Sequence, residues 1–235
     1  MKTKVDEVDR NIYDFKNKDD YEFKMKKGLN KEIVEEISRQ KNDPDWMRKI
    51  RLDALAMYDK LELPTWGPDL SELKMDDIAT YVKPKSKLNS SWDDVPEEIK
   101  NTFDKLGIPD AEKKSLGGVG AQYDSEVVYH SMKEDLLKQG VIYTDMETAV
   151  KEYPEIVKEY FMKCVPISEH KFVALHAAVW SGGSFVYVPK GVKLDIPLQS
   201  YFRLNSPESG QFEHTLIIVD EGASLHFIEG CSAPK

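Results

Sequence analysis

Hydrophobic and polar residues are arranged in two different ways along the chain, and the pattern changes near residue 164. Over residues 1–163 the apolar positions recur mostly at three- and four-residue steps, which predicts amphipathic helices separated by loops. Over residues 164–235 short β-branched and aromatic runs are separated by Gly and Pro, which predicts short strands. We therefore expect an α+β chain with a helical domain over 1–163 and a strand-rich domain over 164–235.

Capping residues place the expected helices. Asn30 fits the N-cap of a helix over 31–41, and Asp43-Pro44 fits the start of a helix that runs to about Leu61. Three further helices are expected. One runs from Pro96 to Gly107, and one covers about 125–139 with Gly140 as its C-terminal cap. The last begins with a Thr144–Glu147 capping box and is interrupted near Pro154.

The segments between these helices are expected to be irregular. We assign 82–95 to a loop and Gly117–Gly120 to a flexible hinge, because this glycine run lacks the spacing of a phosphate-binding loop. Ser181–Ser184 is expected to form a turn between two strands.

An internal similarity runs through the strand-rich domain. Phe185–Ile196 and Leu216–Phe227 align at an offset of 31 residues, which matches Val188 with Val219, Gly191 with Gly222 and Leu194 with Leu225. A strand, a glycine corner and a second strand repeated at a fixed offset indicate stacked coils of a β-solenoid. A cupin-like barrel or a jelly roll also produces such units. The pattern leaves both architectures open.

Charge and cysteine content narrow the function classes. Lys and Arg number 33 against 42 Asp and Glu, a net charge of −9, so we expect no nucleic-acid partner. No apolar stretch approaches the roughly 18–20 residues that a spanning helix needs, and the first 30 residues lack a signal-peptide core, so we expect no membrane association. Two cysteines without a CxxC pair are typical of a reducing compartment, and we expect a cytoplasmic protein.

Candidate chemistry centres on one thiol. Cys231 lies in Glu229–Pro234, directly after the second repeat unit, where a partner protein can reach it as a sulfur acceptor. The alternative is a small buried strand residue, and for Cys164 packing is the favoured interpretation. The histidines show no HxH or HxxxH pair, although His214 and His226 could approach each other on adjacent coils. We therefore expect no intrinsic metal site, which also counts against an active metal-dependent cupin.

Five stretches of the chain resemble one known family in collinear order. They are Ile37–Arg48, Gly118–His130, Leu175–Val192, Pro197–Arg203 and Glu229–Pro234. The chain is similar to the SufB/SufD family of iron–sulfur cluster assembly scaffolds, and its WSGGSFVYVPKGV and EGCSAP runs resemble the SufB branch. The resemblance implies an N-terminal helical domain followed by the first coils of a right-handed parallel β-helix. It also implies that this chain is the truncated N-terminal half of the family and lacks the main cluster-assembly residues.

The resemblance further implies a scaffold rather than an enzyme, one that accepts persulfide sulfur within a SufB–SufC–SufD complex. The implied partners are SufD, the ATPase SufC, and a cysteine desulfurase with its sulfur-transfer partner. A transient iron–sulfur cluster, and a flavin as a further candidate, are implied for the complete complex only. Cys231 matches a family cysteine proposed to accept sulfur, whereas His214 departs from the Arg of the family pattern. The alternative function is a cupin-like metal-binding β-barrel enzyme.

Overall fold

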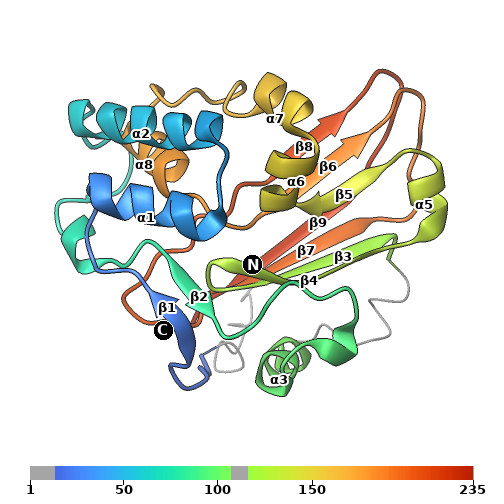
Figure 1. Cartoon of the computed structure of the whole chain (residues 1–235), viewed down its shortest axis with the longest axis horizontal. Coiled ribbons are helices and arrows are strands. Elements are labelled where there is room, and N and C mark those ends of the chain that lie inside the picture. The colour runs from blue at the N-terminus through green and yellow to red at the C-terminus, as the bar shows by residue number, and fades with distance from the viewer. Residues whose placement is uncertain (1–13, 107–115, 235) are drawn as a thin grey trace, which may run out of the picture.

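The computed structural model describes residues 14–106 and 116–234, which form two facing sheets with helices around them (Figure 1). The strands are β1 Tyr21–Lys24, β2 Val82–Pro84, β3 Gly118–Tyr123, β4 Glu126–Met132, β5 Ile142–Asp145, β6 Ser184–Val188, β7 Leu198–Arg203, β8 Leu216–Val219 and β9 Phe227–Ser232. The helices are α1 Lys31–Lys41, α2 Asp45–Lys60, α3 Glu97–Lys105, α5 Glu134–Lys138, α6 Met146–Glu152, α7 Pro154–Tyr160 and α8 Lys171–Val179, with short 3₁₀ helices at Met75–Asp77 and Trp92–Asp94.

The two main sheets share one interior. One sheet has the strand order β4-β3-β7-β9 and the other has the order β5-β6-β8, while β1 and β2 form a separate pair. Tyr143 on β5 crosses the interior and donates a hydrogen bond to the Gln199 carbonyl on β7 over 2.7 Å. Its hydroxyl also lies 2.7 Å from Ser200 Oγ. Because buried hydroxyls need partners, this contact fixes how the two sheets face each other.

The internal repeat predicted from the sequence is confirmed as a stacked pair of units. β6 and β8 are parallel, with Phe185 opposite Leu216 and Val188 opposite Val219, which is the predicted offset. β3, β7 and β9 are also parallel neighbours. Cupin barrels and jelly rolls are built from antiparallel strands, so this register contradicts the alternative of a cupin-like barrel. The right-handed parallel β-helix stays a prediction.

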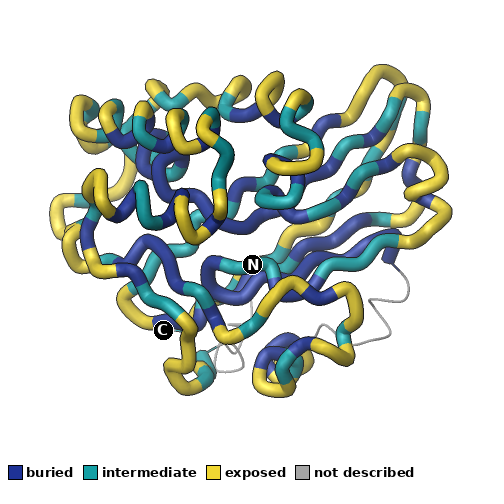
Figure 2. Tube along the Cα trace, viewed as in Figure 1, coloured by how far each residue is buried: buried dark blue, intermediate teal, exposed yellow. Residues whose placement is uncertain are grey.

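Helices cover the outer faces of both sheets (Figures 1 and 2). Phe103 of α3 packs edge-on against Tyr201 of β7, with ring centroids 5.8 Å apart, on the outside of the four-stranded sheet. Tyr153, at the junction of α6 and α7, stacks on Phe185 of β6 on the outside of the other sheet. Helices α1, α2 and α8 gather at one end, opposite α5 (Figure 1). Strands β3, β6 and β7 are mostly buried, while edge strands β8 and β9, the loops and the outer helix faces are more exposed (Figure 2).

The first two predicted helices are confirmed, with one correction at the second N-terminus. Helix α1 spans 31–41, and Asn30 caps it by accepting a hydrogen bond from the Ile33 N–H over 3.0 Å. Helix α2 begins one residue after Pro44, which is itself the N-cap. Asp43 does not cap α2, because its carboxylate accepts a 2.6 Å bond from buried Arg51 Nε. A buried guanidinium needs a counter-charge more than a helix end needs a cap.

The region 117–139 differs most from its prediction. The predicted hinge at Gly117–Gly120 is wrong, because Gly118–Tyr123 form the buried strand β3. The helix expected over 125–139 is also wrong, because this segment holds strand β4 and the short helix α5. A Cβ on Gly118 would lie 2.7 Å from Tyr143 Cδ1, and one on Gly120 would lie 2.9 Å from Tyr143 Oη. These glycines therefore make room for Tyr143 and do not provide flexibility.

Other boundaries also shift. Asp145, and not Thr144, caps α6 by accepting a 2.8 Å bond from the Thr148 N–H, and a new helix begins at Pro154 as expected. Val82–Pro84, expected to be a loop, pairs with β1. The expected helix end at Gly107 lies outside the described residues. Both main sheets combine strands from before and after residue 164.

A helix replaces the first strand expected in the second half. Residues 171–179 form α8, and Ser181–Ser184 joins this helix to β6 instead of joining two strands. Gly182 and Gly183 have φ values of 71° and 91°. A Cβ on Gly183 would lie 2.2 Å from the His214 carbonyl oxygen. The turn therefore needs glycine both for its left-handed backbone and for the close approach of the segment before β8.

Candidate functional site

Cys231 lies on β9, at the edge of the four-stranded sheet, and its side chain is exposed. In the parallel register it stands beside Phe202 of β7. Phe202 is buried between the two sheets, with 2% of its surface exposed. Because side chains paired in register project to the same face, the Cys231 thiol is directed to the interior side of the sheet. The residue therefore occupies a strand, but the alternative of a buried structural cysteine is wrong.

A carboxylate shares the face of Cys231. Glu229 lies two residues earlier on β9 and therefore projects the same way. Its Oε2 accepts a 3.0 Å hydrogen bond from Thr215 Oγ1, which comes from the segment just before β8. Burial, together with the Glu229 charge, raises the pKa of nearby Glu213. Glu229 therefore links β9 to the segment before β8, two residues from the thiol.

The second cysteine offers a comparison within the same chain. Cys164 follows α7 and is also a free, exposed thiol. Its predicted packing role is therefore wrong. It lies between a helix end and Val165-Pro166, as the sequence indicates, but no neighbouring element among the described residues covers it. Exposure alone does not distinguish the two thiols, whereas the strand position and the neighbouring Glu229 do.

The histidines pair differently from the expectation. His214 does not meet His226; its Nδ1 lies 2.8 Å from Nε2 of His176 on α8. Burial lowers the pKa of His176 to about 4 and that of His214 to about 3, so one neutral ring donates to the other. The residues are 38 positions apart, and no short spacing signals the pair. Among the described residues no group of three or more His, Cys, Asp or Glu side chains is placed to hold a metal ion.

A buried ionic cluster joins α1 to strand β4 and helix α6, and sequence reasoning missed it. Lys41 Nζ lies 2.7 Å from carboxylate oxygens of both Glu126 and Glu147. Burial lowers the pKa of Lys41, but the charges of Glu147 and Glu126 outweigh this effect and raise it. Glu147 also accepts a 2.5 Å bond from the Gly182 N–H. The cluster holds the glycine turn before β6 in place.

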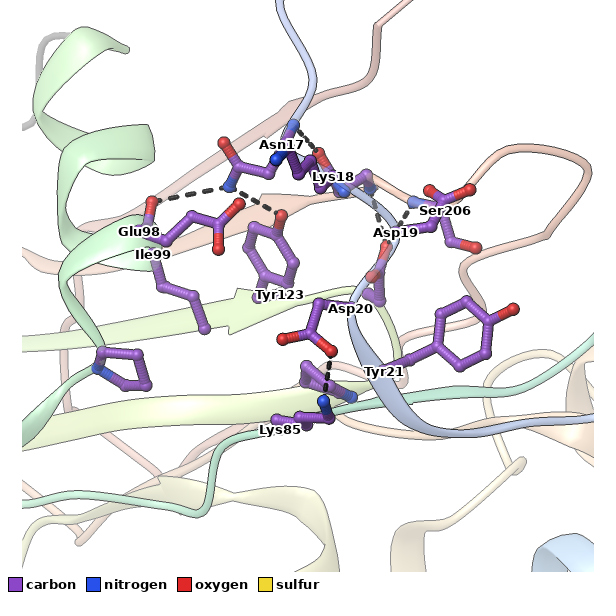
Figure 3. Close-up of a pocket in the computed structure, with 14 residues that line it drawn as sticks. Asn17, Lys18, Asp19, Asp20, Tyr21, Lys85, Glu98, Ile99, Tyr123 and Ser206 are labelled. Atoms are coloured by element: carbon purple, nitrogen blue, oxygen red, sulfur yellow. Dashed lines mark hydrogen bonds and ion pairs between the residues drawn. The ribbon is translucent and has the colours of Figure 1, made fainter.

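A polar recess lies beneath residues 17–21 (Figure 3). Asn17 reaches across it and donates a 2.9 Å hydrogen bond to Tyr123 of β3, and Asp20 pairs with Lys85 on the other side. The recess has a volume of about 70 Å³. Ligand pockets usually hold about 300–1,000 Å³, so this recess is too small for an organic cofactor.

Comparison with known proteins decides the family. A family model described as the N-terminal region of SufBD proteins matches residues 29–200, well over half of the chain. The chain belongs to the SufBD family. This confirms the resemblance stated from its motifs. The matched range runs from α1 to the first half of β7 and includes the Lys41 cluster and His176, while β9 with Cys231 lies beyond it.

Two SufBD relatives extend the similarity to the Cys231 region. The chain is 56% identical over 234 residues to the iron–sulfur cluster assembly protein SufB of Bacillus subtilis strain 168. It is also 56% identical, over the same length, to an iron–sulfur cluster assembly SufBD family protein of Staphylococcus aureus strain MRSA252. Each alignment covers this whole chain and 50% of the relative. The chain therefore spans about half the length of the relatives that it matches.

Over its described residues the chain contains no helix long and apolar enough to cross a membrane.

Proposed function

We propose that the chain takes part in iron–sulfur cluster assembly as a scaffold component, with Cys231 as its sulfur acceptor. Membership of the SufBD family and the names of two relatives support the assembly role. The observation that carries the acceptor role is the exposed Cys231 thiol on edge strand β9, beside Glu229. The chain itself performs no enzymatic turnover in this proposal.

Sulfur acceptance at Cys231 is an exchange of one sulfur–sulfur bond for another. The Cys231 thiolate attacks the terminal sulfur of a donor persulfide, a new S–S bond forms on Cys231, and the donor's S–S bond breaks. The donor cysteine leaves as a thiolate, so no external oxidant or reductant is required. The thiol must first lose its proton, and its exposed position leaves solvent able to receive it.

The proposal assigns the remaining steps to a larger assembly. SufD and the ATPase SufC complete the scaffold, and a cysteine desulfurase with its sulfur-transfer partner supplies the sulfur. The cluster is the cargo of this complex, and we assign the residues that hold it to the half of the relatives that this chain does not span. Two free cysteines support a reducing, cytoplasmic setting. A flavin, if one is used, belongs to the complete complex.

Further strands can add to the open edges of both main sheets. Strands β8 and β9 stand at the edges of their sheets, and both already stack in parallel on the preceding unit. We propose that further coils continue this stacking in proteins of the relatives' length and form a right-handed parallel β-helix. The exposed Ile217 and Val219, which alternate with buried Ile218 on β8, would then become interior residues. The inward-directed Cys231 would be covered in the same way, so we assign the acceptor role to the open β9 edge of this chain.

A transfer assay tests the acceptor role. Persulfide carrying radiolabelled sulfur is generated on the sulfur-transfer protein and mixed with the chain, and label on the chain is followed in a single turnover. We expect Cys231→Ala to abolish labelling. Cys164→Ala is the matched control, since it removes the other exposed thiol, and we expect it to be labelled like the unchanged chain. Full labelling of Cys231→Ala would exclude the proposed role.

A further inference from the structure

A second feature of the molecule is an open groove, one lining residue of which, Thr215, contacts the acceptor strand β9. Its volume is about 350 Å³, and it is lined by α8, by the segment 162–170 that precedes this helix, and by 213–215. We name it the His176–His214 groove, after the pair that contributes to its lining. Its lining is mainly apolar and includes Met162, Val165 and Phe172.

The groove carries little charge. His176 and His214 satisfy each other through their 2.8 Å contact, and burial keeps both rings neutral at physiological pH. Glu213 is the acidic residue in the lining, and burial with the Glu229 charge raises its pKa. An acidic segment would find no counter-charge in this lining and a basic one would meet only Glu213, so the mainly apolar groove suits an uncharged, apolar segment of a partner.

The groove leads directly to the acceptor strand. Thr215, which lines one end, donates the 3.0 Å hydrogen bond to Glu229 on β9. Cys231 lies two residues beyond Glu229 on the same strand face, about 7 Å along the strand. The lining comes from residues outside β8 and β9, with Thr215 directly before β8.

Exposed apolar side chains flank the groove. Trp66 is 78% exposed and contacts His170 edge-on, with ring centroids 5.8 Å apart. Val165, which lines the groove, is 49% exposed. Large exposed aromatic residues next to an apolar groove are typical of protein interaction sites, where Trp often contributes much of the binding energy.

We propose that the His176–His214 groove is the docking site for the persulfide-bearing loop of the sulfur-transfer protein. This inference rests on the proposed function, since it takes Cys231 as the acceptor. An apolar loop in the groove packs against Phe172 and Val165, while Trp66 covers it from the flank. The loop's persulfide then reaches past Thr215 to the Cys231 face of β9.

Substitutions at exposed groove positions test this docking. Val165→Glu places a charge in the apolar lining, and Trp66→Ala removes the flanking aromatic ring. Leu137→Glu is the matched control, because Leu137 is 55% exposed on α5 at the opposite end of the molecule (Figure 1). Affinity for the sulfur-transfer protein encoded by the same genome is measured by titration calorimetry. Circular dichroism and the urea midpoint establish that each variant is folded.

We expect Val165→Glu to raise the Kd for the sulfur-transfer protein at least about tenfold, because docking would bury its charge in the apolar lining. Trp66→Ala should weaken binding in the same direction, and Leu137→Glu should bind like the unchanged chain. Transfer at saturating donor should be retained in both groove variants, since Cys231 is intact.

Two results separate this inference from the function on which it rests. Folded Val165→Glu and Trp66→Ala variants that bind with unchanged Kd would overturn the docking site, even if Cys231→Ala blocks transfer. Conversely, Cys231→Ala should bind the donor with unchanged Kd and fail in transfer. If that variant instead accepts sulfur at the normal rate, the acceptor role fails, while the Kd values still decide the docking site.

Discussion

At the scale of single residues, the buried charges define the most specific contacts of the molecule. Lys41 is balanced by Glu126 and Glu147, and Arg51 by Asp43. Asp145 is different, because none of the described cations forms an ion pair with it. Burial raises its pKa to about 6, and the Glu147 charge adds to this effect. Ionised Asp145 therefore costs stability, although its oxygens cap α6 through Thr148.

Because the pKa of Asp145 is raised, we predict that removing its charge increases the free energy of unfolding by an amount that depends on pH. The folded state binds this proton more tightly than the unfolded chain, so the contribution of Asp145 to stability falls as pH rises from about 4 to 6. Asp145→Asn keeps a capping oxygen and removes the charge. We expect it to raise the unfolding free energy at pH 7 by about 1–3 kcal/mol and to have little effect at pH 4.

Urea unfolding at several pH values measures this difference. The comparison with the unchanged chain is essential, because buried His130, His176 and His214 have lowered pKa values and destabilise the fold as pH falls below about 6.5. Asp135→Asn, at an exposed position on α5, is the control and should show no pH-dependent difference. A gain from Asp145→Asn that stays constant from pH 4 to 7 would contradict the raised pKa.

At the scale of elements, the close fit of β3 against Tyr143 holds the two sheets together. Gly120→Ala would bring a Cβ to 2.9 Å from Tyr143 Oη and 3.1 Å from Ser200 Oγ. We expect a loss of about 1–3 kcal/mol in unfolding free energy, the usual cost of overpacking. Gly67→Ala is the control, since no atom of the described residues lies within 4 Å of the Cβ that this substitution adds.

A double-mutant cycle with Tyr143→Phe shows whether the hydroxyl is the obstacle. Tyr143→Phe removes the atom that the new Cβ meets, so Gly120→Ala should cost less in this variant than in the unchanged chain. Chemical denaturation of the four proteins supplies the coupling energy. An unchanged cost in both backgrounds would show that Tyr143 does not determine the glycine at position 120.

The same elements show what the sequence could and could not predict. Helix α1 was predictable because its cap and its apolar face are local signals. The parallel pairing of β6 with β8 was predictable because the repeat preserves the register. Strand β4 was mistaken for a helix because its identity depends on pairing with β3. Helix α8 is apolar at all positions except Lys171 and His176 and therefore shows little helical periodicity.

The candidate site was predictable to a similar degree. Cys231 was found from its local context and its place after the repeat, and the structure places it on β9. Its neighbours were not predictable in the same way. The contacts of Thr215 with Glu229 and of His176 with His214 join segments that no short spacing relates, and only the fold brings them together.

At the scale of the whole molecule, two facing sheets and a flanking groove converge on one edge strand. The sheets place Cys231 in line with buried Phe202, and the groove ends at Thr215 beside the same face. Membership of the SufBD family, together with relatives named as iron–sulfur cluster assembly proteins, supports the role proposed for this arrangement. The central claim is that Cys231, and not Cys164, receives the sulfur.

Peptide mapping by mass spectrometry tests that claim most directly. The unchanged chain is incubated with the persulfide-loaded sulfur-transfer protein, its thiols are alkylated, and it is digested with trypsin. The two cysteines then separate, because Cys164 falls in the peptide Cys164–Lys171 and Cys231 in Leu204–Lys235. We predict the mass of one added sulfur atom, removable by a reductant, on Leu204–Lys235 alone. Added sulfur on Cys164–Lys171, or on neither peptide, would contradict the account.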